Sequence, residues 1–127
     1  MLKKVGIFLA VTAWISLSEF IRNSFLLRDF WVEHYQAMGQ VFPEAPVNGA
    51  VWGIWTMVYT LVIIELSKHR NWAITSVWAW VLAFPMMWLV IGNLGVLPWG
   101  ILPFALPLSM LETVVAVLII KKSGVFA

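Results

Sequence analysis

The chain of 127 residues contains no cysteine and few charged side chains. Without cysteine it has no disulfide scaffold, and the redox state of its compartment stays undetermined. Charged residues make up 11% of the sequence, whereas a soluble domain carries about 25%. So few charges exclude a surface covered by water. The sequence also has no charge-rich or low-complexity tract, which excludes a disordered region and a nucleic-acid-binding arm.

Hydrophobic residues are abundant, at 62% of the chain, and the mean hydropathy is +0.92. A bilayer core about 30 Å thick is crossed by a helix of roughly 20 apolar residues. Backbone polar groups must be satisfied inside the membrane, so spans of this kind are helices. The sequence therefore predicts an all-α, polytopic membrane protein in which residues 1–127 form a single domain. The predicted spans are about 5–27, 47–66, 72–94 and 98–120.

The first of these spans begins like a secretory signal peptide. Lys3 and Lys4 precede a short apolar run, and Val11–Ala13 resembles a small-residue cleavage site. Hydrophobicity continues well past that site, however. We therefore expect a true membrane span.

Basic residues indicate how the spans are oriented. Six of the eight lysine and arginine residues fall before span one, between spans two and three, or after span four. With four spans these three regions lie on the same side, whereas Arg22 and Arg28 lie on the other. Because short cytoplasmic loops are rich in basic residues, we expect a multi-pass protein of the cytoplasmic (inner) membrane with both termini cytoplasmic.

The connection between spans one and two, residues 28–46, is the only long one. Asp29 is expected to cap a short helix and Gly39 to end it. One face of this helix carries Trp31, Tyr35 and Met38. Aromatic rings with polar edges favour the headgroup region, so residues 29–39 are predicted to form an interfacial helix. The alternative is that span one continues beyond the bilayer.

Small and polar residues recur along the spans, mostly at spacings of four, three and four. They are Thr12, Ser16, Glu19 and Asn23 in span one; Gly49, Gly53, Thr56 and Thr60 in span two; Ser76, Ala79 and Ala83 in span three; and Ala105, Ser109, Glu112 and Ala116 in span four. Membrane helices associate through such residues, because these allow close approach and interhelical hydrogen bonds. Together with the short later loops, this predicts a compact, left-handed, antiparallel bundle. Gly49 and Gly53 would alternatively form a dimer contact.

Proline and tryptophan also occur within the spans. Pro85, Pro103 and Pro107 each remove a backbone donor, which predicts helix shaping or, alternatively, a gate. Six tryptophans lie well inside spans, and each indole N–H needs a partner when buried. We expect several of them to face protein or a cavity; they are Trp14, Trp52, Trp55, Trp78, Trp80 and Trp88.

Glu112 is the most informative single residue. At 1.5 Å per residue it lies roughly 13 Å from the cytoplasmic end of span four, near the middle of the bilayer. An ionisable group there costs about 2.5–3.5 kcal/mol or more and indicates a functional site, here for proton coupling or cation binding. No lysine or arginine is expected at this depth. Glu112 should then be neutral, hydrated or hydrogen-bonded to Ser109, Thr56, Thr60 or Thr12. The alternative is a protonated glutamate that only holds helices together.

A second polar cluster is predicted at the outer ends of the helices. Glu19 lies roughly 22 Å from the cytoplasmic end and can pair with Arg22, one turn away. The expected cluster consists of Glu19, Arg22, Asn23, Asn48 and Asn93, which His34 would join. Such a set suits a headgroup or an anionic substrate, or else a hydrogen-bond network that closes the bundle. It contains no catalytic or metal-ligand motif.

These features favour small-molecule binding or transport through a polar pocket centred on Glu112, with no catalytic residue, cofactor or metal assigned. One alternative is a non-catalytic accessory subunit of a larger membrane complex. A second is an intramembrane enzyme acting on a lipid or isoprenoid, which we favour less. The expected partners are membrane lipids and either further copies of the chain or a larger membrane complex, without nucleic acid.

Overall fold

The computed structural model describes residues 1–127 and is entirely helical, with no strand, as expected. The elements in chain order are α1 (Leu2–Ile21), a π-helical turn η1 (Arg22–Leu26), α2 (Arg28–Ala37), α3 (Pro46–Ser67), α4 (Trp72–Ala83), α5 (Pro85–Asn93), a 3₁₀ turn η2 (Trp99–Ile101) and α6 (Leu102–Ser123). Four helical segments are long and apolar enough to cross a membrane, which suggests a multi-pass membrane protein. They are Leu2–Leu26, Pro46–Ser67, Trp72–Asn93 and Trp99–Ser123. Their ends lie within a few residues of the predicted spans.

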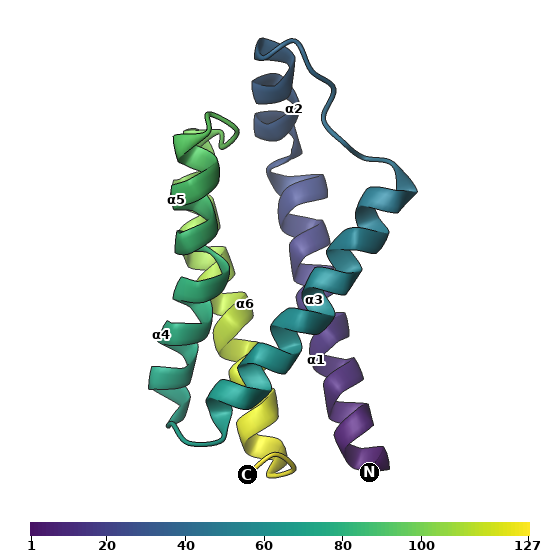
Figure 1. Cartoon of the computed structure of the whole chain (residues 1–127), viewed down its shortest axis with the longest axis vertical. Helices are drawn as coiled ribbons and strands as arrows, with labels where there is room; N and C mark the ends of the chain where they lie inside the picture. The colour runs from purple at the N-terminus through teal and green to yellow at the C-terminus, as the bar shows by residue number, and fades with distance from the viewer.

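The helices are arranged around the contact between α3 and α6. α1 and α4 each pack against both of these helices. Figure 1 shows both termini at one end, called here the terminal end, and α2 at the other, the α2 end. It also shows α3 leaning away from α5, so that the helices diverge toward the α2 end. The predicted antiparallel pairs, α3 with α4 and α4–α5 with α6, are present.

The predicted seam of span four forms the centre of the molecule. Ala105, Ser109, Glu112 and Ala116 are all at most 1% exposed. Ser76, Ala79 and Ala83 of α4 are also buried, as are Thr56 and Thr60 of α3. Small side chains at these positions allow the helix backbones to approach closely. The small and polar spacing therefore correctly identified the inner faces of α4 and α6 and the inner part of α3.

The glycine pair of span two departs from this pattern. A Cβ atom placed on Gly49 or Gly53 would meet nothing within 4 Å, so no helix packs closely on either residue. The prediction that this part of the seam faces a neighbouring helix is wrong, because α3 diverges from the bundle at this end (Figure 1). The two glycines instead line a cavity of about 160 Å³, the α1–α3 groove. Its lining residues are Ser16, Glu19, Phe20, Asn23, Ser24, Gly49, Trp52, Gly53 and Thr56.

Substituting Gly53 with isoleucine should therefore leave a folded protein. The new side chain enters the groove rather than a helix contact, and any residue is a better helix former than glycine except proline. Size-exclusion chromatography and circular dichroism in detergent test this expectation. The matched control is Ala79→Ile, because Ala79 is fully buried and a larger side chain there overpacks the core. Loss of folding in Gly53→Ile would contradict the open groove.

The three span prolines occupy different helix positions. Phe84, with φ −113° and ψ −68°, interrupts span three between α4 and α5, and Pro85 starts α5. Pro107 lies inside α6. Pro103, in contrast, lies in the first turn of α6, where no intrahelical donor is needed. It therefore begins a helix and does not kink one.

Tyr59 joins three helices. Its hydroxyl group donates a hydrogen bond to the carbonyl oxygen of Ala79 in α4, at 3.2 Å, and lies 2.9 Å from Oγ1 of Thr113 in α6. Replacing Tyr59 with phenylalanine removes both contacts and should lower the free energy of unfolding by about 1 kcal/mol. Unfolding by SDS in detergent micelles, followed by circular dichroism, measures this change. An unchanged unfolding curve would show that the hydroxyl contributes nothing to helix association.

The connection between α1 and α3 contains the predicted short helix. α2 ends at Ala37 and is followed by Gly39 at φ 72°, as expected, but the residue that precedes its first turn is Leu27 and not Asp29. Asp29 lies in the first turn, where its carboxylate still interacts favourably with the helix dipole. Figure 1 shows α2 extending along the direction of α1 past the end of α5. This arrangement matches the alternative in which span one continues, and the interfacial location stays a prediction.

Aromatic contacts and one ion pair hold the chain after α2 against that helix. The Phe42 ring lies 5.9 Å from the Trp31 ring and 5.3 Å from the Tyr35 ring, between centroids. Arg28 and Glu44 form a two-point ion pair with N–O distances of 2.9 and 2.7 Å. The hydrogen bonds from Arg28 lower the pKa of the Glu44 carboxyl. Because both side chains are solvent-exposed, this pair contributes little to stability.

Candidate functional site

The site is built where α1 passes into the π-helical turn η1. The amide of Leu27 donates to the carbonyl of Arg22 at 2.8 Å, a bond across five residues that widens the helix. Turns of this kind are frequent at functional sites. Glu19, Arg22 and Asn23 lie on the inner face around this turn and are 4%, 5% and 8% exposed. The sequence therefore places three strongly polar side chains inside an apolar molecule.

These three side chains pair with one another. Arg22 Nη2 lies 2.5 Å from Glu19 Oε1, which confirms the predicted ion pair. Asn23 Nδ2 donates to Glu19 Oε2 at 3.1 Å. Trp31, expected only as a residue of the membrane interface, donates its indole N–H to Asn23 Oδ1 at 3.2 Å. One oxygen of Glu19 thus contacts a guanidinium and the other an amide, which fixes the carboxylate in place.

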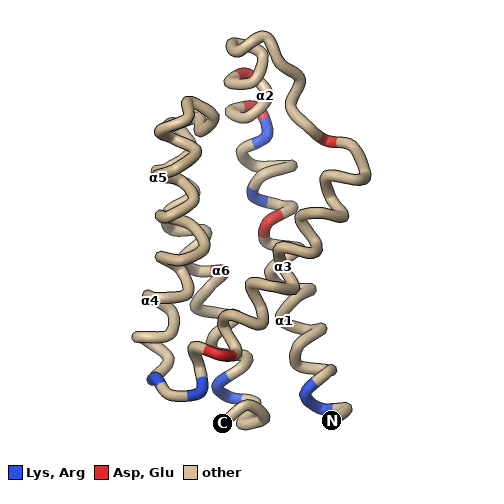
Figure 2. The backbone as a smooth tube through the Cα atoms, in the orientation of Figure 1, with Lys and Arg blue, Asp and Glu red and all other residues tan.

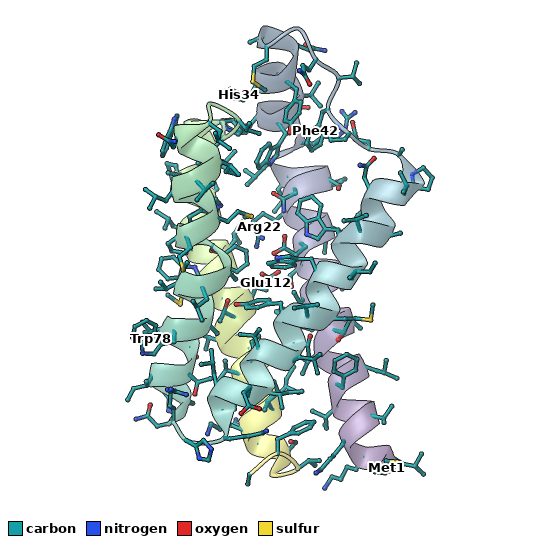
Figure 3. All side chains as sticks on the ribbon, in the orientation of Figure 1. Met1, Arg22, His34, Phe42, Trp78 and Glu112 are labelled. Carbon is teal, nitrogen blue, oxygen red and sulfur yellow. The ribbon has the colours of Figure 1, made fainter.

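Arg22 also reaches Glu112. Its Nη1 atom lies 3.6 Å from Glu112 Oε2, and its guanidinium carbon lies 5.1 Å from the centre of the Phe84 ring. Figure 3 shows Arg22 and Glu112 one above the other in the middle of the molecule. The expectation that no basic group lies at the depth of Glu112 is therefore wrong. We call Glu19, Arg22 and Glu112 the buried charge cluster.

The direction in which helical side chains lean explains why Arg22 reaches Glu112. Side chains lean toward the N-terminus of their helix. α1 and α6 are antiparallel neighbours, so Arg22 leans toward the terminal end while Glu112 leans toward the α2 end (Figures 1 and 3). The two side chains converge although their Cα atoms lie at different depths. The rise per residue gives the depth of each Cα atom but not of the side-chain end, so it does not reveal this contact.

The Glu112 carboxyl group has no hydrogen-bond partner. Glu112 is 1% exposed, and neither Oε1 nor Oε2 accepts a hydrogen bond. A buried carboxylate normally accepts several, because an unsatisfied acceptor away from water is costly. The guanidinium of Arg22 contacts only one of the two oxygens, at ion-pair distance. The second oxygen, Oε1, is buried and has no partner.

The hydroxyl groups expected to bond Glu112 have other partners. Thr56 donates to the carbonyl of Trp52, Thr60 to that of Thr56, and Ser109 to that of Leu106. Thr12 donates to the Thr60 hydroxyl at 3.1 Å. Serine and threonine in helices commonly bond a carbonyl one turn earlier. The prediction of hydrogen bonds from these four residues to Glu112 is therefore wrong, although Thr12 and Thr60 do meet.

Two of the six span tryptophans contact the same region. Trp14 donates its indole N–H to the backbone carbonyl of Glu112, and Trp80 donates to the Ser109 hydroxyl, both at 2.9 Å. These two half-buried tryptophans therefore face protein, as expected, whereas Trp88, which is 7% exposed, makes no side-chain hydrogen bond. Trp52 is 41% exposed and lines the α1–α3 groove, whereas Trp78 is 52% exposed.

Three residues of the predicted outer cluster lie elsewhere. The Asn48 side chain accepts the amide of Ala45 at the start of α3. Asn93 is exposed at the end of α5. His34 Nε2 lies 2.7 Å from the carbonyl oxygen of Gly95, in the turn after α5. The predicted grouping of Asn48, Asn93 and His34 with Glu19 is therefore wrong, because it relied on similar depth, and residues at one depth can face different neighbours.

The buried charge cluster lies between two cavities. Glu19 lines the α1–α3 groove, whereas Arg22 and Glu112 line a cavity of about 180 Å³ between α1 and α6. We call the second cavity the α1–α6 groove. It is lined by Trp14, Leu17, Ser18, Ile21, Arg22, Leu26, Leu108, Leu111 and Glu112. The sequence identified both glutamates from their depth, but neither groove could be located without the helix packing.

The charges of the cluster do not balance. Two carboxylates face one guanidinium, which leaves one negative charge if both carboxylates are ionised. Burying an unpaired charge in a medium of low dielectric constant is expensive. One proton, or one singly charged cation, neutralises the cluster.

Comparison of the chain with protein-family models, with curated proteins and with solved structures gave no match in any of the three. A functional assignment therefore depends on the geometry of the buried charge cluster.

Proposed function

We propose that this chain is an integral protein of the cytoplasmic membrane, formed by a single four-helix domain, that binds or transports a small molecule at a site centred on Glu112. Exchange of a proton at Glu112 accompanies binding. The observation that carries this proposal is the Glu112 carboxyl group, which is 1% exposed and accepts no hydrogen bond. Its contact with Arg22 is an ion pair at 3.6 Å that involves Oε2 alone, so Oε1 has no partner of either kind.

The orientation is part of the proposal. The basic residues in the first turn of α1, between α3 and α4, and at the end of α6 lie at the terminal end, as Figure 2 shows in blue. Short cytoplasmic loops carry this excess of lysine and arginine, so we place both termini in the cytoplasm. Glu19 and Arg22 then lie nearer the outer surface than Glu112. α2 stands at that surface, with Trp31 and Tyr35 at headgroup level.

Each residue of the site has a distinct role in the proposal. Glu112 takes up and releases the proton and contacts the ligand. Arg22 holds Glu112 beside Glu19, and Asn23 keeps Glu19 from rotating. Thr56 lines the α1–α3 groove, and the remaining predicted residues, Ser109, Thr12 and Thr60, maintain the helix contacts around the cluster.

A second candidate function is that of a non-catalytic accessory subunit. The uncovered glycine pair Gly49–Gly53 favours it, because such pairs allow close approach of another helix. This function needs no proton exchange at Glu112. The two candidates therefore differ in a property that is measurable without knowledge of the ligand.

The experiment is a pH jump on proteoliposomes adsorbed to a solid-supported membrane. A proton that enters the membrane interior to reach Glu112 displaces charge and gives a transient current. We expect this current in the wild type and in Glu65→Gln, which alters an exposed carboxyl group outside the cluster. In Glu112→Gln it should fall at least tenfold while circular dichroism shows an unchanged fold. A wild-type current that persists in Glu112→Gln, or its absence from the wild type, would overturn the proposal.

A further inference from the structure

The α1–α6 groove is apolar except at Ser18, Arg22 and Glu112. Most of its lining consists of Trp14, Leu17, Ile21, Leu26, Leu108 and Leu111. Leu17 and Leu111 are 55% and 57% exposed, so the groove opens on the outer surface of the α1–α6 contact. In the proposed membrane orientation, this surface faces acyl chains. A ligand of the groove therefore enters sideways from the bilayer and carries an apolar chain.

The polar end of the groove selects the sign of the ligand's charge. Glu112 lines the groove, but both of its carboxylate oxygens are buried and neither accepts a hydrogen bond. Arg22 lies between Glu112 and Glu19. An anion would meet two carboxylates for one guanidinium. A neutral apolar molecule would leave the carboxyl group of Glu112 unpartnered. A cation with N–H donors satisfies both the charge and the hydrogen bonds.

We propose that the α1–α6 groove binds an amphiphilic primary amine in its ammonium form, with the ammonium group on Glu112 and the alkyl chain along Leu17 and Leu111. This inference rests on the proposed function, since it names the class of ligand for the same site. The protonated cluster is neutral before binding. When the ammonium ion binds, the Glu112 proton passes to water, so that one positive charge replaces another. No other step or reactant is needed.

Protons and the amine therefore compete for one carboxyl group. The charged side chains packed around Glu112 are Glu19 from α1 and Arg22 from η1. Tyr59 from α3, whose hydroxyl group lies 2.9 Å from Thr113 of α6, is a further titratable group in this region. Span three contributes only uncharged side chains to this region: Trp80 of α4, Trp88 of α5 and Phe84 between them. We expect amine affinity to fall as the pH is lowered, because protons then occupy Glu112.

The test follows the indole N–H resonance of Trp14 by NMR in detergent micelles, because this group contacts the backbone of Glu112 and Trp14 lines the groove. The probe is n-hexylammonium chloride. The matched probes are 1-hexanol, which has the chain without the charge, and hexyltrimethylammonium, which has the charge without an N–H donor. Only n-hexylammonium should give a saturable shift at low concentration, with both controls at least tenfold weaker.

Variants distinguish binding of the amine in the groove from nonspecific partitioning of the amine into the micelle. Glu112→Gln should weaken n-hexylammonium binding at least tenfold. Leu111→Trp and Leu26→Trp, at two exposed positions of the lining, should do the same by filling the groove. Leu89→Trp, on the exposed face of α5, is the control and should bind as the wild type does.

An equal response to 1-hexanol, or undiminished binding by Glu112→Gln, would overturn the amine site. Failure of this inference is distinguishable from failure of the proposed function. A pH-jump current that depends on Glu112, without any n-hexylammonium binding, would refute the amine site but still support proton exchange at Glu112.

Discussion

Replacing Arg22 with methionine is expected to lower the free energy of unfolding by about 3–5 kcal/mol, the cost of leaving a buried charge unpaired. Methionine keeps much of the arginine's length but removes the only cation near Glu19 and Glu112, which are 4% and 1% exposed. Two carboxyl groups then remain in an apolar interior. SDS unfolding in dodecyl maltoside micelles, followed by circular dichroism, measures the loss.

A second substitution identifies the cause of that loss. Adding Glu19→Gln to Arg22→Met removes one of the two carboxylates and should recover much of the lost stability. The matched control is Arg28→Met, which breaks the exposed Arg28–Glu44 pair and should leave unfolding nearly unchanged. If Arg22→Met unfolds no more easily than Arg28→Met, Arg22 does not balance the buried carboxylates.

Replacing Phe84 with alanine should cost about 3 kcal/mol and should also loosen Arg22. Phe84 is 1% exposed, and its ring centre lies 5.8 to 6.1 Å from those of Trp55, Tyr59 and Trp88. Removing a buried aromatic ring leaves a cavity that its neighbours fill only in part. The guanidinium 5.1 Å above the ring also loses its cation–π contact. The same SDS unfolding assay measures the total change.

A double-mutant cycle separates the two contributions of Phe84. If the cation–π contact matters, Phe84→Ala and Arg22→Met together should cost about 0.5–2 kcal/mol less than the sum of the single substitutions. Phe20→Ala is the control, since Phe20 is 63% exposed and its loss leaves no internal cavity. Strict additivity of the two substitutions would show that Phe84 only fills space.

Much of the candidate site follows from rules that apply to a single helix. The depth of Glu112 and the i,i+3 spacing of Glu19 and Arg22 are countable along the chain, and the structure places all three residues in one buried cluster. The spacing of small residues likewise identifies the buried face of α6. Helical rise and period are local properties, so they are readable without knowledge of the neighbouring helices.

Contacts between helices were harder to anticipate. Asn48 and Asn93 were assigned to the predicted cluster by their depth alone. Asn48 instead bonds the backbone at the start of α3, and Asn93 is exposed. Thr56, Thr60 and Ser109 bond to carbonyl groups of their own helices, and Thr12 bonds to Thr60 instead of Glu112. Phe84 is apolar, so no sequence pattern marked it as part of the site. Its position before Pro85 is the only indication of the break in span three, which places the Phe84 ring under Arg22.

The amino-acid sequence by itself determined that this protein is helical, that four segments are long and apolar enough to span a membrane, and that charged groups lie within them. Hydropathy and periodicity suffice for this, because each segment must satisfy its own backbone and bury or expose its own faces. Only the tertiary structure decided that Arg22 reaches Glu112 and that Gly49 and Gly53 remain uncovered. Both outcomes depend on how α3 leans and on the opposite directions of α1 and α6, which arise from packing between helices distant in the sequence.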